Sequence, residues 1–470
     1  MLEYYTNNSV TFDQVVTNGY GRQIIKTKQN KIDKNNIVDE LSKALVVHNQ
    51  NAVEINYLEN YYRGDQPILY RKKDIRPEIN NKIVENLAFM IVEAKTAEIV
   101  AEPIQYVLKG VDESKSEQIN QLNKLMDEED KHHFDIDLKR WACICGTAYR
   151  FIGNDEGQGR LLDESPFYLS VEDPRYTFVV YYQNGKPAFS CQIRENEKGN
   201  TVYNCYTDGQ YFLIMDSKIV DEQFNANAAI PVVEYPNNSR RLSDIEITIS
   251  LTDCIDKMAS ERQNGIDQFV QSFIKFVNCE IDEEEFKKMA QYGAFVVRSN
   301  NGTDNKADVD IMASELNQTE SQVAVSDLYS RLLEIQGMAS RQDAVGSDTG
   351  SAAKVRTGQY DSEKRAELAE PIFKRSERMM LRIVLNRLRI KNDFTLTAND
   401  IDIHISRSKM DNALTKAEVL QILLSCGVEE SIAIKTVGLF ADAEGTYLAS
   451  KQRMSILYPK EIQLDTQVNV

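Results

Sequence analysis

Residues 243–277 have the sequence SDIEITISLTDCIDKMASERQNGIDQFVQSFIKFV. Ser243 and Glu246 stand three positions apart, which is the spacing of a capping box at the start of a helix. After them, apolar residues recur at helical intervals on one stripe: Leu251, Ile255, Met258, Ile266, Phe269, Val270, Phe273 and Val277. We therefore predict a helix over residues 244–277, about 50 Å long.

A second stretch, VGSDTGSAAK at residues 345–354, is a polar turn of small residues between two further helical patterns. These patterns cover residues 318–337 and 350–390, and Pro371 is expected to kink the second helix. Residues 279–316, before the returning helix, predict a small mixed unit with short strands. A long helix, a short excursion, a returning helix and a polar loop can line a channel when many copies form a ring.

The composition is ordinary for a globular protein, with an acidic balance. The chain has 470 residues, a length that corresponds to about three domains. Of these residues, 42% are hydrophobic and 27% are charged. The formal net charge is −17. Proteins that grip nucleic acid over a broad face are usually basic, so we expect no tight DNA binding beyond local basic clusters. An acidic wall beside DNA would instead repel it and act as a low-friction surface.

Seven cysteines are present at spacings that fit no common zinc or disulfide framework, which favours reduced thiols in a cytoplasmic setting. The N-terminus has no basic region before an apolar run, so we expect no signal peptide. No apolar run reaches about 18 residues, so we expect no membrane contact.

The remaining chain predicts an α+β fold that is mainly helical. Residues 1–35 are polar and predict a loosely ordered segment. Helical periodicity predicts helices over residues 36–62, 80–101 and 115–146, and again within 414–455. β-branched and aromatic runs predict strands between residues 147 and 235, and one more at 401–405. Asn184-Gly185 and Asp208-Gly209 predict hairpin turns.

Four stretches, in this order, resemble the portal proteins of tailed double-stranded DNA bacteriophages, of the siphophage type. Tyr61 to Ile68 resembles the family's YYxGxxxI element, and Asn80 to Ile104 resembles the helix that follows it. Pro231 to Asn238, followed by Ser243 to Glu246, is similar to the entry of the stem helix. Thr349 to Lys354 resembles the element after the tunnel loop. Together the stretches cover roughly residues 50–440.

The resemblance implies a portal fold with a wing, a stem, a clip and a crown, assembled as a ring around a central channel. The implied division is a flexible N-terminal segment (1–35), wing (36–243), stem helix (244–278), clip (279–316), second stem helix (317–337), tunnel loop (338–350), long kinked helix and wing strand (351–405), crown (406–455) and flexible C-terminal tail (456–470).

The implied function is passage of the viral genome at one capsid vertex, during packaging and ejection. Family members form rings, usually of about twelve subunits. The implied partners are other copies of the chain, double-stranded DNA in weak non-specific contact, terminase, major capsid or scaffolding protein, and head-completion (adaptor) proteins. The implied location is the virion, after synthesis in the bacterial host cytoplasm. Neither cofactor nor metal nor catalytic residue is implied.

The resemblance also implies which residues face the channel or the partners. The expected tunnel-loop residues are Met338, Arg341, Gln342, Asp343, Ala344, Val345, Gly346, Ser347, Asp348 and Thr349. On the predicted stem helix, Lys257, Arg262 and Lys275 are candidates for facing DNA, with salt bridges to neighbouring subunits as the alternative. The expected clip docking surface contains Glu283, Glu284, Glu285, Asn300, Asn301 and Gly302.

Other motifs give alternatives. Asp348-Thr349-Gly350-Ser351 matches the aspartic protease signature once, whereas such enzymes bring two copies together. His132 and His133 with Cys143 and Cys145 lack the spacing of a zinc site, so buried thiols and exposed histidines are expected. Four aromatic residues are expected in the core or an interface rather than as a base-stacking platform: Tyr61, Tyr62, Trp141 and Phe178.

No phosphate-binding loop of the form GxxxxGK[ST] is present, so we expect no ATP hydrolysis by this chain. The sequence leaves open a different head protein, a scaffold or connector without a DNA channel.

Overall fold

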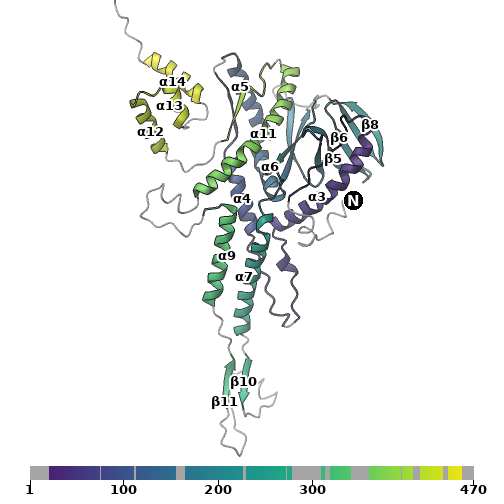
Figure 1. The fold of residues 1–470 in the computed structure, drawn as a ribbon, viewed down its shortest axis with the longest axis vertical. Coiled ribbons are helices and arrows are strands. Elements are labelled where there is room, and N and C mark those ends of the chain that lie inside the picture. The colour runs from purple at the N-terminus through teal and green to yellow at the C-terminus, as the bar shows by residue number, and fades with distance from the viewer. Residues whose placement is uncertain are drawn as a thin grey trace, which may run out of the picture. The chain divides into compact units, whose positions relative to one another are not determined.

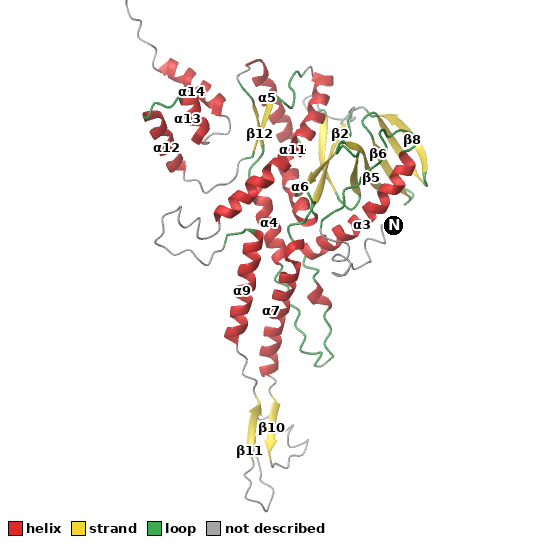
Figure 2. Cartoon of the chain, in the orientation of Figure 1, coloured by secondary structure: helices red, strands yellow, loops and turns green. Residues whose placement is uncertain are grey.

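The computed structural model shows helices and antiparallel sheets, in the α+β combination that the sequence predicts (Figure 1, Figure 2). It describes residues 21–74, 76–110, 113–154, 165–225, 229–270, 273–277, 308–312, 318–339, 359–392, 394–405, 413–437 and 443–457. The chain divides into two units. Unit 1 contains Met1–Arg63, Ala88–Ile247 and Gly337–Val470, and unit 2 contains Gly64–Leu87 and Thr248–Gln336.

One part of unit 1 is a five-stranded antiparallel sheet with the helix α3 (Ile37–Tyr62) packed on it. Its strands, in spatial order, are β4 (Thr177–Tyr181), β5 (Pro187–Glu195), β6 (Thr201–Tyr206), β7 (Gln210–Met215) and β8 (Lys218–Phe224). Ile37 and Leu41 of α3 share one buried cluster with Phe178, Phe189 and Phe212 of the sheet. Both predicted hairpin turns join neighbouring strands here, so the strand prediction for this region is confirmed.

The second core of unit 1 surrounds a three-stranded antiparallel sheet of order β3-β2-β9. Its strands are β2 (Thr147–Asn154), β3 (Phe167–Glu172) and β9 (Val232–Pro236). Four helices supply the buried side chains around it: α4 (Leu87–Val100), α5 (Glu113–Glu128), α6 (Lys131–Cys145) and α11 (Gln359–Asn392). A separate pair, β1 (Gln105–Leu108) with β12 (Ile401–His404), belongs to the same cluster.

Gly146 ends α6, as the sequence predicts, and nothing larger fits there. Its φ is +86°, in the left-handed region that favours glycine. A Cβ atom at this position would lie 1.9 Å from the backbone oxygen of Arg241. The residue therefore lets the chain before the predicted stem helix pass directly against the end of α6.

Three short helices follow in the C-terminal part: α12 (Ala413–Ser425), α13 (Glu430–Val437) and α14 (Ala443–Leu457). They contact one another in sequence, α12 with α13 and α13 with α14. The prediction of at least two short helices in this region is confirmed.

Unit 2 is built on two helices that run side by side, α7 (Ile249–Val270) and α9 (Gln318–Gln336) (Figure 1). Between the two helices in the sequence, β10 (Phe273–Val277) pairs antiparallel with β11 (Asp308–Met312). A short 3-10 turn, η1 (Pro67–Tyr70), also belongs to this unit, and a second, η2 (Glu246–Thr248), lies where the chain enters it. The predicted sequence of helix, excursion and returning helix is therefore present.

Two predicted helices have wrong boundaries. The helix predicted over residues 244–277 ends at Val270, and the apolar run from Phe273 forms a strand instead, because a short apolar run suits both structures. The helix predicted from Asn80 begins at Leu87. In α11, Pro371 lies inside a helix that continues on both sides of it.

Candidate functional site

A stripe of buried polar side chains lies on α7 and the turn before it. Five residues at intervals of four are almost fully buried: Thr248, Thr252, Asp256, Ser260 and Asn264. Positions four apart lie on one face of a helix. Of the predicted apolar stripe, Ile255 is buried, Leu251 and Met258 are half-buried, and Ile266 is exposed. The buried face of α7 is therefore more polar than predicted.

The polar stripe binds the backbone of residues 81–85. The N–H groups of Asn81, Ile83 and Glu85 donate hydrogen bonds to three successive positions of the stripe, at 2.7, 2.9 and 2.9 Å. The acceptors are Asn264 Oδ1, Ser260 Oγ and Asp256 Oδ1 respectively. We call this arrangement the stem ladder.

Simple geometry explains the register of the stem ladder. Four residues of an α-helix rise about 6.0 Å, and two residues of an extended chain advance about 6.6 Å. Alternate N–H groups of a chain running antiparallel to the helix therefore meet acceptors at every fourth position. These N–H groups serve α7 rather than a helix of their own, which is why α4 starts only at Leu87.

Ion pairs and an amide extend the stem ladder. Glu261 on α7 is paired with Arg71 Nη1 at 2.6 Å and Lys73 Nζ at 3.0 Å. The side-chain amide of Asn81 donates to Asp267 Oδ2 at 2.6 Å. Directional hydrogen bonds and ion pairs, more than apolar burial, therefore fix residues 71–73 and 81–85 against α7.

The negative charge of Asp256 is unfavourable in its buried position on the stem ladder. Burial raises the pKa of its carboxyl to about 6, although the hydrogen bond from the Glu85 N–H acts in the opposite direction. The carboxylates of Asp253 and Glu85 add to the rise. Its second oxygen, Oδ2, is buried without a hydrogen-bond partner among the described residues. Protonation of Asp256 below about pH 6 therefore removes the buried negative charge and stabilises the stem ladder.

The helix α9 contributes one polar contact and several exposed apolar side chains. Gln336 Nε2 donates to Thr248 Oγ1 at 3.0 Å. Leu332 and Leu333 are buried, whereas Val323 is 63% and Ile335 is 42% exposed. Two helices alone do not cover the apolar surface that both carry.

The three stem candidates do not share one helix. Lys257 is exposed on α7 and Arg262 is half-buried on it. Lys275 lies on β10, so its prediction as a residue of the stem helix is wrong. The facing of these residues toward DNA stays a prediction.

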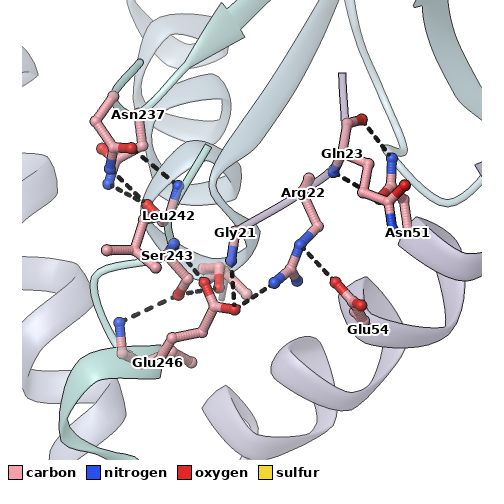
Figure 3. Close-up of polar contacts among 12 residues, drawn as sticks. Gly21, Arg22, Gln23, Asn51, Glu54, Asn237, Leu242, Ser243 and Glu246 are labelled. Carbon is pink, nitrogen blue, oxygen red and sulfur yellow. Dashed lines mark hydrogen bonds and ion pairs between the residues drawn. The ribbon is translucent and has the colours of Figure 1, made fainter. Parts of the chain in front are cut away.

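In unit 1, the capping box at Ser243 is formed as predicted (Figure 3). The Ser243 N–H donates to Glu246 Oε2 at 2.7 Å, and Ser243 Oγ accepts from the Ile245 N–H at 3.1 Å. The Ser243 hydroxyl also lies 2.6 Å from the backbone oxygen of Ile144, to which it donates. The chain is therefore fixed to the end of α6 just before it enters unit 2.

Arg22 completes this junction by lying between two carboxylates (Figure 3). Its guanidinium contacts Glu246 and lies 3.0 Å from Glu54 of α3. The Gly21 N–H donates to Glu246 Oε1 at 3.3 Å. Burial raises the pKa of Glu54 to about 7, while Arg22 lowers it and Glu246 raises it further. The predicted loose order of residues 1–35 does not apply to residues 21–35, which the structure describes.

A buried ion cluster in unit 1 was not predicted from the sequence. Glu377 on α11 accepts hydrogen bonds from Tyr106 and Tyr235 at 2.6 and 2.7 Å. Lys131 lies 3.0 Å and Arg150 lies 3.2 Å from its carboxylate. Burial alone would raise the pKa of Glu377, but these two cations hold the pKa below its ordinary value.

Asp135 is the second carboxylate of this cluster and contacts both of its cations. It lies 2.6 Å from Lys131 and also pairs with Arg150. Two carboxylates and two cations, from the three elements α6, β2 and α11, thus compensate one another. The sequence around Arg150 gives no sign of this cluster, because its partner Glu377 lies 227 residues away.

The remaining candidates divide into those described and those not. Met338 is described and half-buried, whereas Arg341 to Thr349 lie outside the described residues, as do the clip candidates Glu283 to Glu285 and Asn300 to Gly302. Within the described chain, Tyr61 and Phe178 are buried, as predicted.

The metal alternative has no geometric support in the described chain. His133 is exposed, whereas Cys143 and Cys145 are buried. Groups of three or more His, Cys, Asp or Glu side chains able to hold a metal do not occur among the described residues. Of the helices that the structure describes, none has the length and apolar character of a membrane span.

A model of the family "phage portal protein, SPP1 Gp6-like" matches residues 42–444. No curated protein matches the chain. Among solved structures, the chain is similar to a chain from the "neck of empty GTA particle computed with C6 symmetry". That similarity has 11% sequence identity and a TM-score of 0.46, and it covers 76% of this chain and 90% of the other.

The family match spans most of the sequence, including the capping box, α7, α9 and α11. Phage portal proteins are structural and not enzymes, which removes the peptidase alternative at Asp348. The chain belongs to the phage portal protein family, SPP1 Gp6-like.

Proposed function

We propose that the chain forms a ring, of about twelve subunits, around a channel through which the phage genome is packaged and ejected. The observation that carries this proposal is the helix pair of unit 2. Its two helices leave Ile266, Val323 and Ile335 exposed, and copies of the same pair in a closed ring supply the missing packing surface.

The parts of the ring follow from the family resemblance, adjusted to the observed elements. The stem is α7 with α9, and the clip is residues 279–316, in which β11 pairs with β10 just before the clip. The wing comprises residues 36–243 and 351–405, and the crown comprises 406–455. The clip, with Glu283 to Glu285 and Asn300 to Gly302, docks terminase during packaging and head-completion proteins afterwards.

The mechanism is mechanical and electrostatic. Residues 338–350 form a loop that shifts as DNA moves through the channel. Arg341 touches phosphate transiently, while Asp343 and Asp348 keep the contact weak. The net charge of −17 limits adhesion of DNA to the ring.

Deletion of residues 340–348 tests the channel function against the alternative of a connector without a DNA channel. We expect the deletion variant to assemble like the wild type, as judged by its mass in light scattering, and to package less DNA per particle. A variant with the same residues replaced by a Gly/Ser linker of equal length controls for chain length. Normal packaging by both variants, in rings that assemble, would reject the loop mechanism and favour the connector.

A further inference from the structure

A basic cleft lies in unit 1 beside α11. Its volume is about 740 Å³. Six cationic side chains line it: Lys26, Lys186, Arg241, Arg375, Arg378 and Arg382. The chain as a whole carries a net charge of −17, so this is a local concentration of positive charge on an acidic protein.

Three of the six cations share one face of a single helix. Arg375, Arg378 and Arg382 are exposed and stand three and four positions apart on α11. Such positions are neighbours on a helix surface, and the first and last are about 10.5 Å apart along the axis. The opposite face of α11 packs into the core through residues such as Val384 and Leu388. The helix therefore presents the three guanidinium groups from a rigid base.

The carboxylates near the basic cleft are already engaged. Glu234, which also lines it, accepts hydrogen bonds from Arg241 at 2.5 and 2.7 Å. Glu370, just before the arginine face, is paired with Lys374 at 2.6 Å.

The other five cations have no such partner. Lys26, Lys186, Arg375, Arg378 and Arg382 form no ion pair with a carboxylate of the described chain. Their charges are available to an external anion.

We propose that the basic cleft binds the phosphate backbone of double-stranded DNA without reading its sequence. Guanidinium groups suit phosphate because their planar N–H donors match its oxygens. One DNA strand carries a phosphate every 3.4 Å or so along the axis, so the arginine face spans about three phosphates. Only the identity of the polyanion rests on the proposed DNA channel; the charge and shape of the cleft do not.

The test is binding of the full-length protein to a labelled DNA duplex of mixed sequence, followed by fluorescence anisotropy over a range of salt concentrations. The test variant is R375A/R378A/R382A. A charge-matched control, K109A/K198A/K218A, removes three exposed lysines elsewhere in unit 1. A third variant, R375K/R378K/R382K, keeps the charge. Light scattering of each variant checks that assembly is unchanged.

We expect the alanine variant to lose at least about tenfold in affinity and its salt dependence to weaken by about two to three counterions, roughly one for each lost phosphate contact. The lysine variant retains most of the affinity and the control variant behaves like the wild type.

Two outcomes would overturn the inference. The first is equal DNA affinity for the alanine and control variants. The second is displacement of DNA by polyglutamate at comparable charge concentration, which would assign the cleft to an acidic protein segment. In either case an unchanged ring mass would leave the proposed ring intact, so the two proposals fail separately.

Discussion

Glu377 is the buried carboxylate that compensates two buried cations of unit 1. Lys131 and Arg150 are both buried within 3.2 Å of it. Removal of one member of a buried ion cluster leaves the opposite charges without compensation. The tyrosines Tyr106 and Tyr235 would lose their acceptor as well.

We therefore expect Glu377→Ala to lower the free energy of unfolding by about 3–5 kcal/mol, measured by urea denaturation. Glu367→Ala is the control, because Glu367 lies on the same helix in an exposed pair with Lys364. Its effect should stay within about 0.5 kcal/mol. Equal effects of the two substitutions would contradict the structural role of the ion cluster.

The sequence predicts the local polar contacts of this chain and not the distant ones. The capping box was predictable because Ser243 and Glu246 lie three residues apart. Glu377 was not, because its partners come from other elements up to 271 residues away and a charged residue in a helix ordinarily faces solvent.

At the scale of elements, the stem ladder joins an irregular segment to a helix through polar groups. Asp256 is its weakest step, because the carboxylate is buried with one oxygen unpartnered among the described residues. The pKa of its carboxyl is about 6, above the ordinary value of 3.8. The folded state therefore binds more protons than the unfolded state between about pH 4 and pH 6, and stability falls as pH rises across that range.

We expect Asp256→Asn to remove this pH dependence and to stabilise unit 2 by about 1 kcal/mol at pH 7.5, since Asn keeps the Oδ1 acceptor for the Glu85 N–H. Hydrogen exchange of the α7 amides at pH 5 and pH 7.5 measures the effect. Asp327→Asn, at an exposed carboxylate on α9, serves as the control. Faster exchange in Asp256→Asn at pH 7.5 would show that the charge is needed rather than costly.

The elements themselves were predicted unevenly. The strands between residues 147 and 235 were predicted well, because β-branched and aromatic runs alternate with turn residues. Lys275 was misplaced because the apolar run around it fits a helix and a strand equally. The stem ladder was missed since Ser260 and Asn264 bind residues 177 and 183 positions away, and polar residues four apart resemble a solvated helix face.

At the scale of the whole molecule, the order of elements along the chain agrees with the family to which the sequence was assigned. Helix, excursion, returning helix and long helix follow one another as predicted, and the family match covers residues 42–444. The division into two units was not anticipated in its detail, because Gly64–Leu87 joins the helix pair through the stem ladder, a contact that no local pattern encodes.

The proposed ring is the central claim, and its most direct test is negative-stain microscopy of the purified full-length protein combined with light scattering. We predict rings with a central hole and a mass equal to that of about twelve copies of the 53.7 kDa chain. A compact dimer without a central hole would contradict the proposal.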